Sequence, residues 1–315
     1  MKKNLFSEWS RGVLVACVLS FLLVSCGGAG GGSDDDDVTT VAESGGGSSG
    51  GDNVASAAEN AGDISVSTTA RGGANGISGS YVFINGRTVT IWATWCSDHE
   101  VTQAEYQDVM RTNPSLNLTS GTNKPVEQVS WYDAISYCNK LSLKEGLTPC
   151  YTVNGVDFSG EVAVPSGNNE TWNAAECNFS ANGYRLPTEA EWEYFARGGN
   201  LTNSGQTTYS GSETIRNVAW YTDNSSFTTH DVKTKAKNSR NLYDMSGNVG
   251  EWCWDWFGDI SASTLSTGVS SGSCRVIRGG SWLSDASVCS VAYRLKEDPW
   301  FLSCMNGFRV VRTAN

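Results

Sequence analysis

Residues 278–311 read RGGSWLSDASVCSVAYRLKEDPWFLSCMNGFRVV. The stretch opens with the motif RGGSW (278–282) and closes with NGFR (306–309). The residues between these ends follow neither the 3.6-residue period of a helix nor the two-residue period of a strand. They also include the apolar run Trp300-Phe301-Leu302. A regular frame thus encloses an irregular, partly apolar interior, and the question is what such a segment does.

The composition of the whole chain limits the classes of function. The chain has 315 residues, 35 of them glycine, with 17% charged residues and a net charge of −11. High glycine with few charges is typical of a loop-rich globular protein. The acidic balance argues against a nucleic-acid partner, because phosphate binding needs clustered Lys and Arg. His99 and His230 are the only histidines, which argues against a multi-histidine zinc site.

The N-terminus has the features of an export signal. Basic residues precede an apolar run over 13–24 that is too short to cross a membrane as a helix. The run ends in LVSC (23–26), which resembles the lipobox of bacterial lipoproteins, whose cysteine carries the lipid. We therefore predict a lipoprotein signal peptide over 1–25 and lipidation of Cys26, which would anchor the protein at the cell surface in the bacterial (outer) membrane. A plain signal peptide with an incidental cysteine is the alternative.

Two further regions follow the signal. Residues 26–79 are rich in Gly, Ser and Asp and lack aromatic side chains, so they offer little apolar area for folding and are predicted to form a tether. All tryptophans except Trp9 lie between residues 80 and 315. No second linker interrupts this part. We therefore predict one compact domain over 80–315.

Short helices with clear start signals stand out within this domain. We predict a helix over 102–110, a second over 130–144 with Ser130 as its N-cap, and a third that begins with a capping box at Thr188. A closing strand is expected over 307–312. The remainder reads as short strands and long loops, which predicts an α+β class with much irregular structure.

Six motifs occur in order along the domain: EVTQ (100–103), KPV with VSW (124–131), YRLPTEAEWE (184–193), LYDMSGNV with EW (242–252), RGGSW (278–282) and GFR (307–309). Together they resemble the formylglycine-generating enzyme (sulfatase-modifying factor) family over nearly all of 80–315. The resemblance implies the family's fold, an α+β domain of the C-type-lectin-like type with little regular structure.

The same resemblance implies where catalysis would occur. The family's oxidase holds copper(I) with two cysteines five residues apart, just after the RGGS motif. The second position corresponds here to Cys289 and the first to Ser284. A serine hydroxyl cannot replace a thiolate as a ligand for a soft ion. We therefore predict no catalytic residues, no enzyme activity and no required cofactor. A copper oxidase of this family remains an alternative that Ser284 disfavours.

The preserved frame with an irregular interior also resembles the variable proteins of diversity-generating retroelements, which use this lectin-type fold and replace residues near the C-terminus. The resemblance implies a variable segment over about 275–312. It also implies a ligand-binding surface made by Leu283, Ser284, Val288, Leu295, Lys296, Glu297, Trp300, Phe301, Leu302, Ser303, Cys304 and Met305. The expected function is a lipid-anchored surface receptor for a protein or glycan ligand. A fixed-specificity envelope protein is a further alternative.

The apolar run over 300–302 allows two interpretations. Trp, Phe and Met are types that concentrate binding energy at the centre of interfaces, which favours display. A short apolar run is equally consistent with a buried strand, because its periodicity cannot be assigned. Pro299 before the run and Asn306-Gly307 after it favour a loop.

A calcium site is the remaining expectation from the resemblance. Family members hold calcium within the motif that here spans 244–251. The side chains of Asp244 and Glu251 and the carbonyls of Gly247 and Val249 would be the ligands, and hard oxygen ligands on a glycine-containing turn suit this ion. The alternative is that Asp244 and Glu251 only hydrogen-bond the turn.

Overall fold

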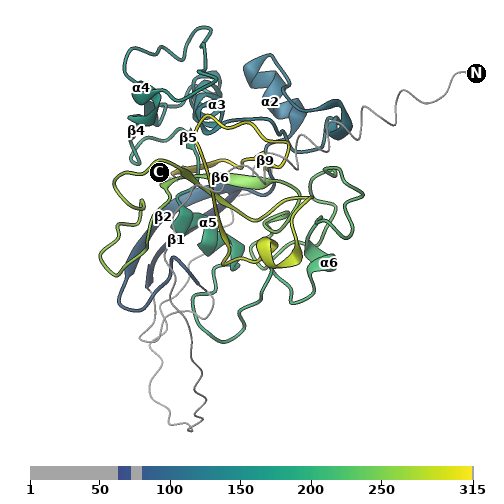
Figure 1. The fold of residues 1–315 in the computed structure, drawn as a ribbon. Helices are drawn as coiled ribbons and strands as arrows, with labels where there is room; N and C mark the ends of the chain where they lie inside the picture. The colour runs from purple at the N-terminus through teal and green to yellow at the C-terminus, as the bar shows by residue number, and fades with distance from the viewer. Residues whose placement is uncertain (1–62, 72–79, 314–315) are drawn as a thin grey trace, which may run out of the picture. The chain divides into compact units, whose positions relative to one another are not determined.

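The computed structural model describes residues 63–71 and 80–313 (Figure 1). The elements are short, and strands and helices alternate with long connections, which confirms the α+β class. The α-helices are α2 (Gln103–Met110), α3 (Trp131–Lys144), α4 (Glu170–Asn173), α5 (Glu189–Ala196) and α6 (Ile215–Val218), and short 3₁₀ turns span Asn117–Thr119 (η1) and Ala286–Cys289 (η2). Within these residues no helix has the length and apolar character needed to cross a bilayer.

The strands form two larger sheets and one hairpin-like pair. One sheet has the order β1-β2-β10-β5, the other β8-β7-β6-β9, and β3 pairs with β4. Their bounds are β1 Asp63–Arg71, β2 Thr88–Ser97, β3 Tyr151–Thr152, β4 Glu176–Cys177, β5 Tyr184–Arg185, β6 Gly250–Trp256, β7 Arg275–Arg278, β8 Arg294–Glu297, β9 Asn306–Gly307 and β10 Val311–Thr313.

The three predicted helices are confirmed together with their start signals. The N-caps Thr102, Ser130 and Thr188 each accept a hydrogen bond from the backbone amide three residues later. In each case the side chain at that third position accepts one from the N-cap backbone in return. These capping boxes satisfy amides that the first helical turn leaves without partners.

Two boundaries differ from the sequence-based expectation. The closing strand predicted over 307–312 is split, because β9 pairs in parallel with β6 whereas β10 pairs with β2 and β5. The chain thus passes from one sheet to the other at residues 308–310. Strand β1 lies within the predicted tether and pairs antiparallel with β2. The folded part therefore begins before residue 80, and the alternating ISVS (64–67) was the signal for it.

The core is dominated by aromatic side chains. Trp131, Trp192, Trp252 and Trp282 are at most 1% exposed. One cluster of buried side chains gathers around α3 and includes Phe308, and a second gathers around α5 and β2. Burying a large apolar side chain contributes roughly 1.5–3 kcal/mol. This filled core supports the long loops around it.

Two buried ion pairs connect different motifs, and a third lies within the motif of residues 184–193. In each pair an arginine of one motif meets a glutamate of a helix or strand motif at 2.6 Å, and both side chains are fully buried. The pairs are Arg185–Glu191, Arg278–Glu193 and Arg309–Glu251. A buried charge is tolerated only when it is paired and hydrogen-bonded. These six charged side chains of the motifs therefore have a structural role in the core.

Candidate functional site

The frame of the C-terminal segment is anchored in the core at both ends. Trp282 is 1% exposed, its ring nitrogen donates to the carbonyl of Cys304 at 2.8 Å, and its amide donates to the carbonyl of Asn248 at 2.7 Å. Phe308 at the other end is fully buried and contacts the rings of Tyr106 and Tyr137. The segment from 283 to 305 is thus held at two fixed points.

Four residues predicted for the binding surface are buried, which corrects the sequence-based set. Ser284, Ser303, Cys304 and Met305 are 8%, 6%, 1% and 6% exposed. Backbone pairing explains the burial: the amides of Gln128 and Gly250 donate to the carbonyls of Ser303 and Met305. Residues 303–305 lie against the core beside β9, and Ser284 at the other end is hydrogen-bonded to the amide of Ser281, so these side chains belong to the scaffold.

The other eight predicted residues differ in how far they are exposed. Lys296 and Leu302 are exposed, whereas Leu283, Val288, Leu295, Glu297, Trp300 and Phe301 are half-buried. Leu295 and Trp300 pack against the cluster around α3. Residues 300–302 lie outside the strands, so the loop interpretation of this run is confirmed. The segment does contain one strand that its spacing did not indicate, β8, which pairs antiparallel with β7.

Sequence reasoning missed three exposed residues of the segment, Asp285, Ser287 and Tyr293. Tyr293 is 39% exposed and immediately precedes β8. Its residue type was the available signal, because tyrosine is enriched at interfaces. We group it with the exposed Lys296 and Leu302 and with the half-buried Phe301, which adjoins Leu302 in the chain. We call these four residues the displayed set.

The position that corresponds to the family's copper site has the wrong chemistry. Cys289 is fully buried, and this burial raises the pKa of its thiol to about 12. Ser284 is buried too, and its hydroxyl accepts a hydrogen bond from the amide of Ser281 at 2.9 Å. A soft metal ion needs an accessible thiolate pair, and a buried thiol with a raised pKa is inert. This part of the segment works as packing.

The two carboxylates expected to bind calcium differ in their hydrogen-bond partners. Both carboxylate oxygens of Glu251 accept hydrogen bonds from Arg309, and one of them also accepts the ring N–H of Trp192. Asp244 accepts the amide of Lys233 at 2.7 Å through one oxygen, while its other oxygen is buried without a partner. Burial raises the pKa of Asp244 to about 6. Of these two carboxylates, only Asp244 keeps an oxygen without a partner, because Arg309 holds both oxygens of Glu251.

Hydrogen bonds within the protein also hold the rest of this turn. Glu100, whose pKa burial raises well above its usual range, accepts the amide of Val249 at 3.0 Å and the side-chain amide of Asn248 at 2.7 Å. Gly247 has a φ of +78°, and a Cβ there would lie 2.2 Å from the carbonyl oxygen of Trp220. The turn therefore needs glycine for its shape. The predicted lipidation site Cys26 lies outside the described residues.

Comparison with known proteins agrees with the fold. A family model described as the sulfatase-modifying factor enzyme 1-like domain matches residues 68–314. A Paenibacillus barcinonensis protein named chaperone protein LppX is 38% identical over 247 residues, which are 72% of this chain and 82% of the relative. The formylglycine-generating enzyme of Streptomyces coelicolor is 36% identical over 165 residues, 46% of this chain and 52% of that enzyme.

Among solved structures, Treponema denticola variable protein 1 has a TM-score of 0.68 and 42% identity, covering 72% of this chain and 87% of that chain. The expected fold of the formylglycine-generating-enzyme type and the resemblance to a variable protein are therefore both confirmed. The relatives include a protein named as variable, one named as a chaperone and one named as an enzyme.

Proposed function

The chain belongs to the family of the sulfatase-modifying factor enzyme 1-like domain, and from this premise we propose that it is a lipid-anchored surface receptor that binds a protein or glycan ligand through its C-terminal segment. The observation that carries the proposal is the contrast between frame and interior. Trp282 and Phe308 are buried at the two ends, whereas Tyr293 and Leu302 between them are 39% and 47% exposed.

The exposed side chains suit binding better than an inert surface. The displayed set combines an aromatic hydroxyl, a phenyl ring, an aliphatic side chain and a cation, a mixture typical of protein recognition surfaces. Because packing against the core fixes the neighbouring Leu295 and Trp300, the set can be exchanged without loss of the scaffold. The name of the Treponema relative supports a segment that varies between copies of the gene.

Enzyme activity has less support. The family includes formylglycine-generating enzymes, but the two positions that should hold copper carry a hydroxyl and a thiol that are both buried. We therefore propose a binding protein without catalytic residues. The name of the Paenibacillus relative suggests a second candidate, a chaperone, which would bind unfolded chains of many sequences instead of one folded ligand.

Replacing the displayed set with serine should abolish ligand binding without unfolding the domain. Substitutions at the exposed Tyr293, Lys296 and Leu302 should each change stability by about 0.5 kcal/mol or less. Phe301 is half-buried and should cost more, but the domain should remain folded. The measurement is binding of a ligand found by screening protein and glycan panels with the wild type. The matched control replaces Leu143 and Leu265, which are 40% and 69% exposed outside the segment.

The control variant should retain the ligand. Equal binding by the displayed-set variant, or binding to unfolded proteins without preference, would contradict the receptor proposal. The second result would favour the chaperone.

Lipid attachment at Cys26 can be tested separately from ligand binding. Metabolic labelling with a radioactive fatty acid should mark the wild type and leave Cys26→Ala unlabelled, because the lipobox cysteine is the acceptor. Equal labelling of the two proteins would refute the anchor. Cys17 lies within the apolar run of the same leader, so Cys17→Ala is the control and should be labelled like the wild type.

A further inference from the structure

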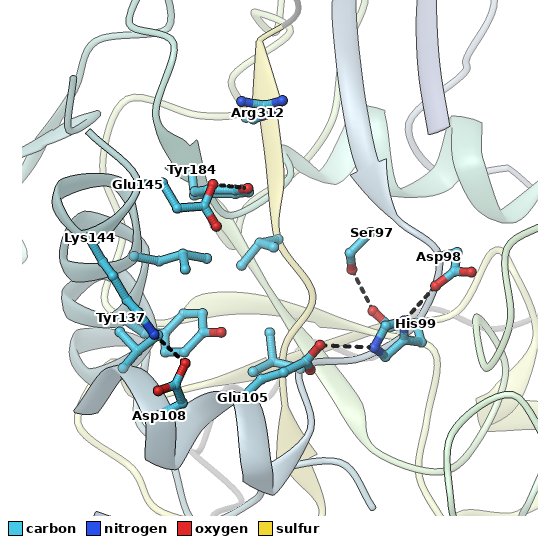
Figure 2. A pocket seen from close by; sticks show the side chains of 14 residues that line it. Ser97, Asp98, His99, Glu105, Asp108, Tyr137, Lys144, Glu145, Tyr184 and Arg312 are labelled. Carbon is cyan, nitrogen blue, oxygen red and sulfur yellow. Dashed lines mark hydrogen bonds and ion pairs between the residues drawn. The ribbon is translucent and has the colours of Figure 1, made fainter. Parts of the chain in front are cut away.

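A cleft of about 440 Å³ lies away from the displayed set. It is bounded by α2, α3, the end of β2 and β10, and none of the residues predicted for the binding surface lines it (Figure 2). Its floor is apolar and is formed by Val101, Val109, Tyr137, Leu141 and Val310. Clefts of roughly 300–1,000 Å³ with an apolar lining and a few polar groups are typical of small-ligand sites.

Most charged groups at the rim of the cleft are already paired. His99 lies between Asp98 and Glu105, at 2.5 Å and 3.3 Å. Although burial acts in the opposite direction, these two carboxylates raise the pKa of His99 to about 9, so the imidazole is charged at neutral pH and neutralised in place. Lys144 pairs with Asp108, as Figure 2 shows. The charges of His99 and Lys144 are therefore already balanced by carboxylates of the protein.

The carboxylate nearest the upper end of the cleft also has a partner. Glu145 accepts the hydroxyl of Tyr184 at 2.8 Å, and Figure 2 shows the two side chains between Lys144 and Arg312. The hydrogen bond directs Glu145 toward Tyr184. It therefore does not neutralise the guanidinium above it.

Arg312 is the exception among the described residues that line the cleft. Arg312 forms no ion pair or hydrogen bond with the other described residues that line the cleft, and its Nε is buried without a partner. Pairing across the sheet places Trp95 on one side of it and Tyr184 on the other, so the three side chains share a face. The guanidinium lies 6.0 Å and 5.6 Å from the centres of those two rings. The rings of Trp95 and Tyr184 can hold the guanidinium of Arg312 in position, but they carry no negative charge to neutralise it.

From this arrangement we propose that the cleft binds a carboxylate with a short apolar body. The carboxylate pairs with the guanidinium of Arg312, whose planar fork of donors matches two carboxylate oxygens. The apolar body covers the floor between Val310 and Leu141. Both a medium-chain fatty acid and the C-terminal end of an apolar peptide have this chemistry. The site is independent of the displayed set, because the two share no residue.

Octanoate and N-acetyl-Val-Leu are the two probes, and chemical shifts in ¹H–¹⁵N NMR spectra of the full chain measure binding. At least one probe should shift the amides of residues around Val310 and Leu141 with saturation. Octanol, which lacks the charge, and acetate, which lacks the apolar body, should bind more weakly by about tenfold or more. Saturation by octanoate alone identifies a fatty-acid site, and saturation by the peptide alone identifies a peptide-terminus site.

Arg312→Gln should weaken binding by about tenfold or more, because one charge-assisted pair is lost. Arg312→Lys should lie between the wild type and Arg312→Gln, since it keeps the charge and loses the fork. The matched control is Lys144→Gln, a cation in the same cleft that already has a partner, which should change affinity by less than about twofold. The Lys variant keeps the test decisive if the Gln variant does not fold.

Equal affinity of the Arg312 variants and the wild type would overturn the proposal, as would the absence of saturable shifts with both probes. A ligand of the displayed set should bind normally to Arg312→Lys. A failure here therefore leaves the receptor proposal intact, and a failure of the receptor proposal leaves this cleft unaffected.

Discussion

Trp282→Ala is expected to lower the free energy of unfolding by about 3–5 kcal/mol, the range for removing a fully buried tryptophan. Trp282 is 1% exposed, and its ring nitrogen donates to the carbonyl of Cys304, across the base of the displayed segment. The substitution therefore leaves a cavity and also a buried carbonyl without its donor. Denaturant unfolding followed by fluorescence and circular dichroism measures the loss.

Trp300→Ala is the matched control for that experiment. It removes the same side chain from the same segment, but Trp300 is half-buried and packs only on the edge of the cluster around α3. Its cost should be less than half of the cost at Trp282. A larger loss of unfolding free energy for Trp300→Ala than for Trp282→Ala would mean that the interior of the segment, and not its frame, holds it in place.

Much of the fold could be predicted from the sequence because the decisive signals are local. Capping boxes at Thr102, Ser130 and Thr188 depend on residues three positions apart, and all three were found where expected. The order of the motifs indicated the family, and two of the buried ion pairs join different motifs across the core. The frame of the displayed segment consists of two such motifs.

The errors arose where distant pairing decides burial. Met305 resembles a display residue by type, yet the amide of Gly250 binds its carbonyl beside β9 and the side chain is 6% exposed. Strand β1 exists because β2 pairs with it, although its composition resembles a tether. The ion-pair partner of Glu251 was likewise hidden, because Arg309 lies 58 positions away in the sequence. Local spacing cannot report such contacts.

Arg309→Met is expected to destabilise the protein by about 3–5 kcal/mol, because breaking a buried ion pair leaves a charge without compensation. Arg309 donates to both carboxylate oxygens of Glu251 at 2.6 Å and 2.7 Å, and both side chains are fully buried. Its other donors reach the backbone carbonyls of Ser97 and Tyr243, so one side chain joins β2, β6 and the turn before β6.

A double-mutant cycle separates the ion pair from these backbone contacts. Glu251→Gln added to Arg309→Met removes the uncompensated charge, so the double variant should recover part of the loss, with a coupling free energy of about 0.5–3 kcal/mol measured by denaturant unfolding. Arg111→Met, at a side chain 76% exposed, is the control and should change stability by about 0.5 kcal/mol or less. Additive effects of the two core substitutions would mean that Arg309 acts through its backbone contacts alone. A clear coupling would instead identify Arg309 as the cation that pairs with Glu251 in the core and show that this pair, beyond the backbone contacts of Arg309, stabilises the start of β6.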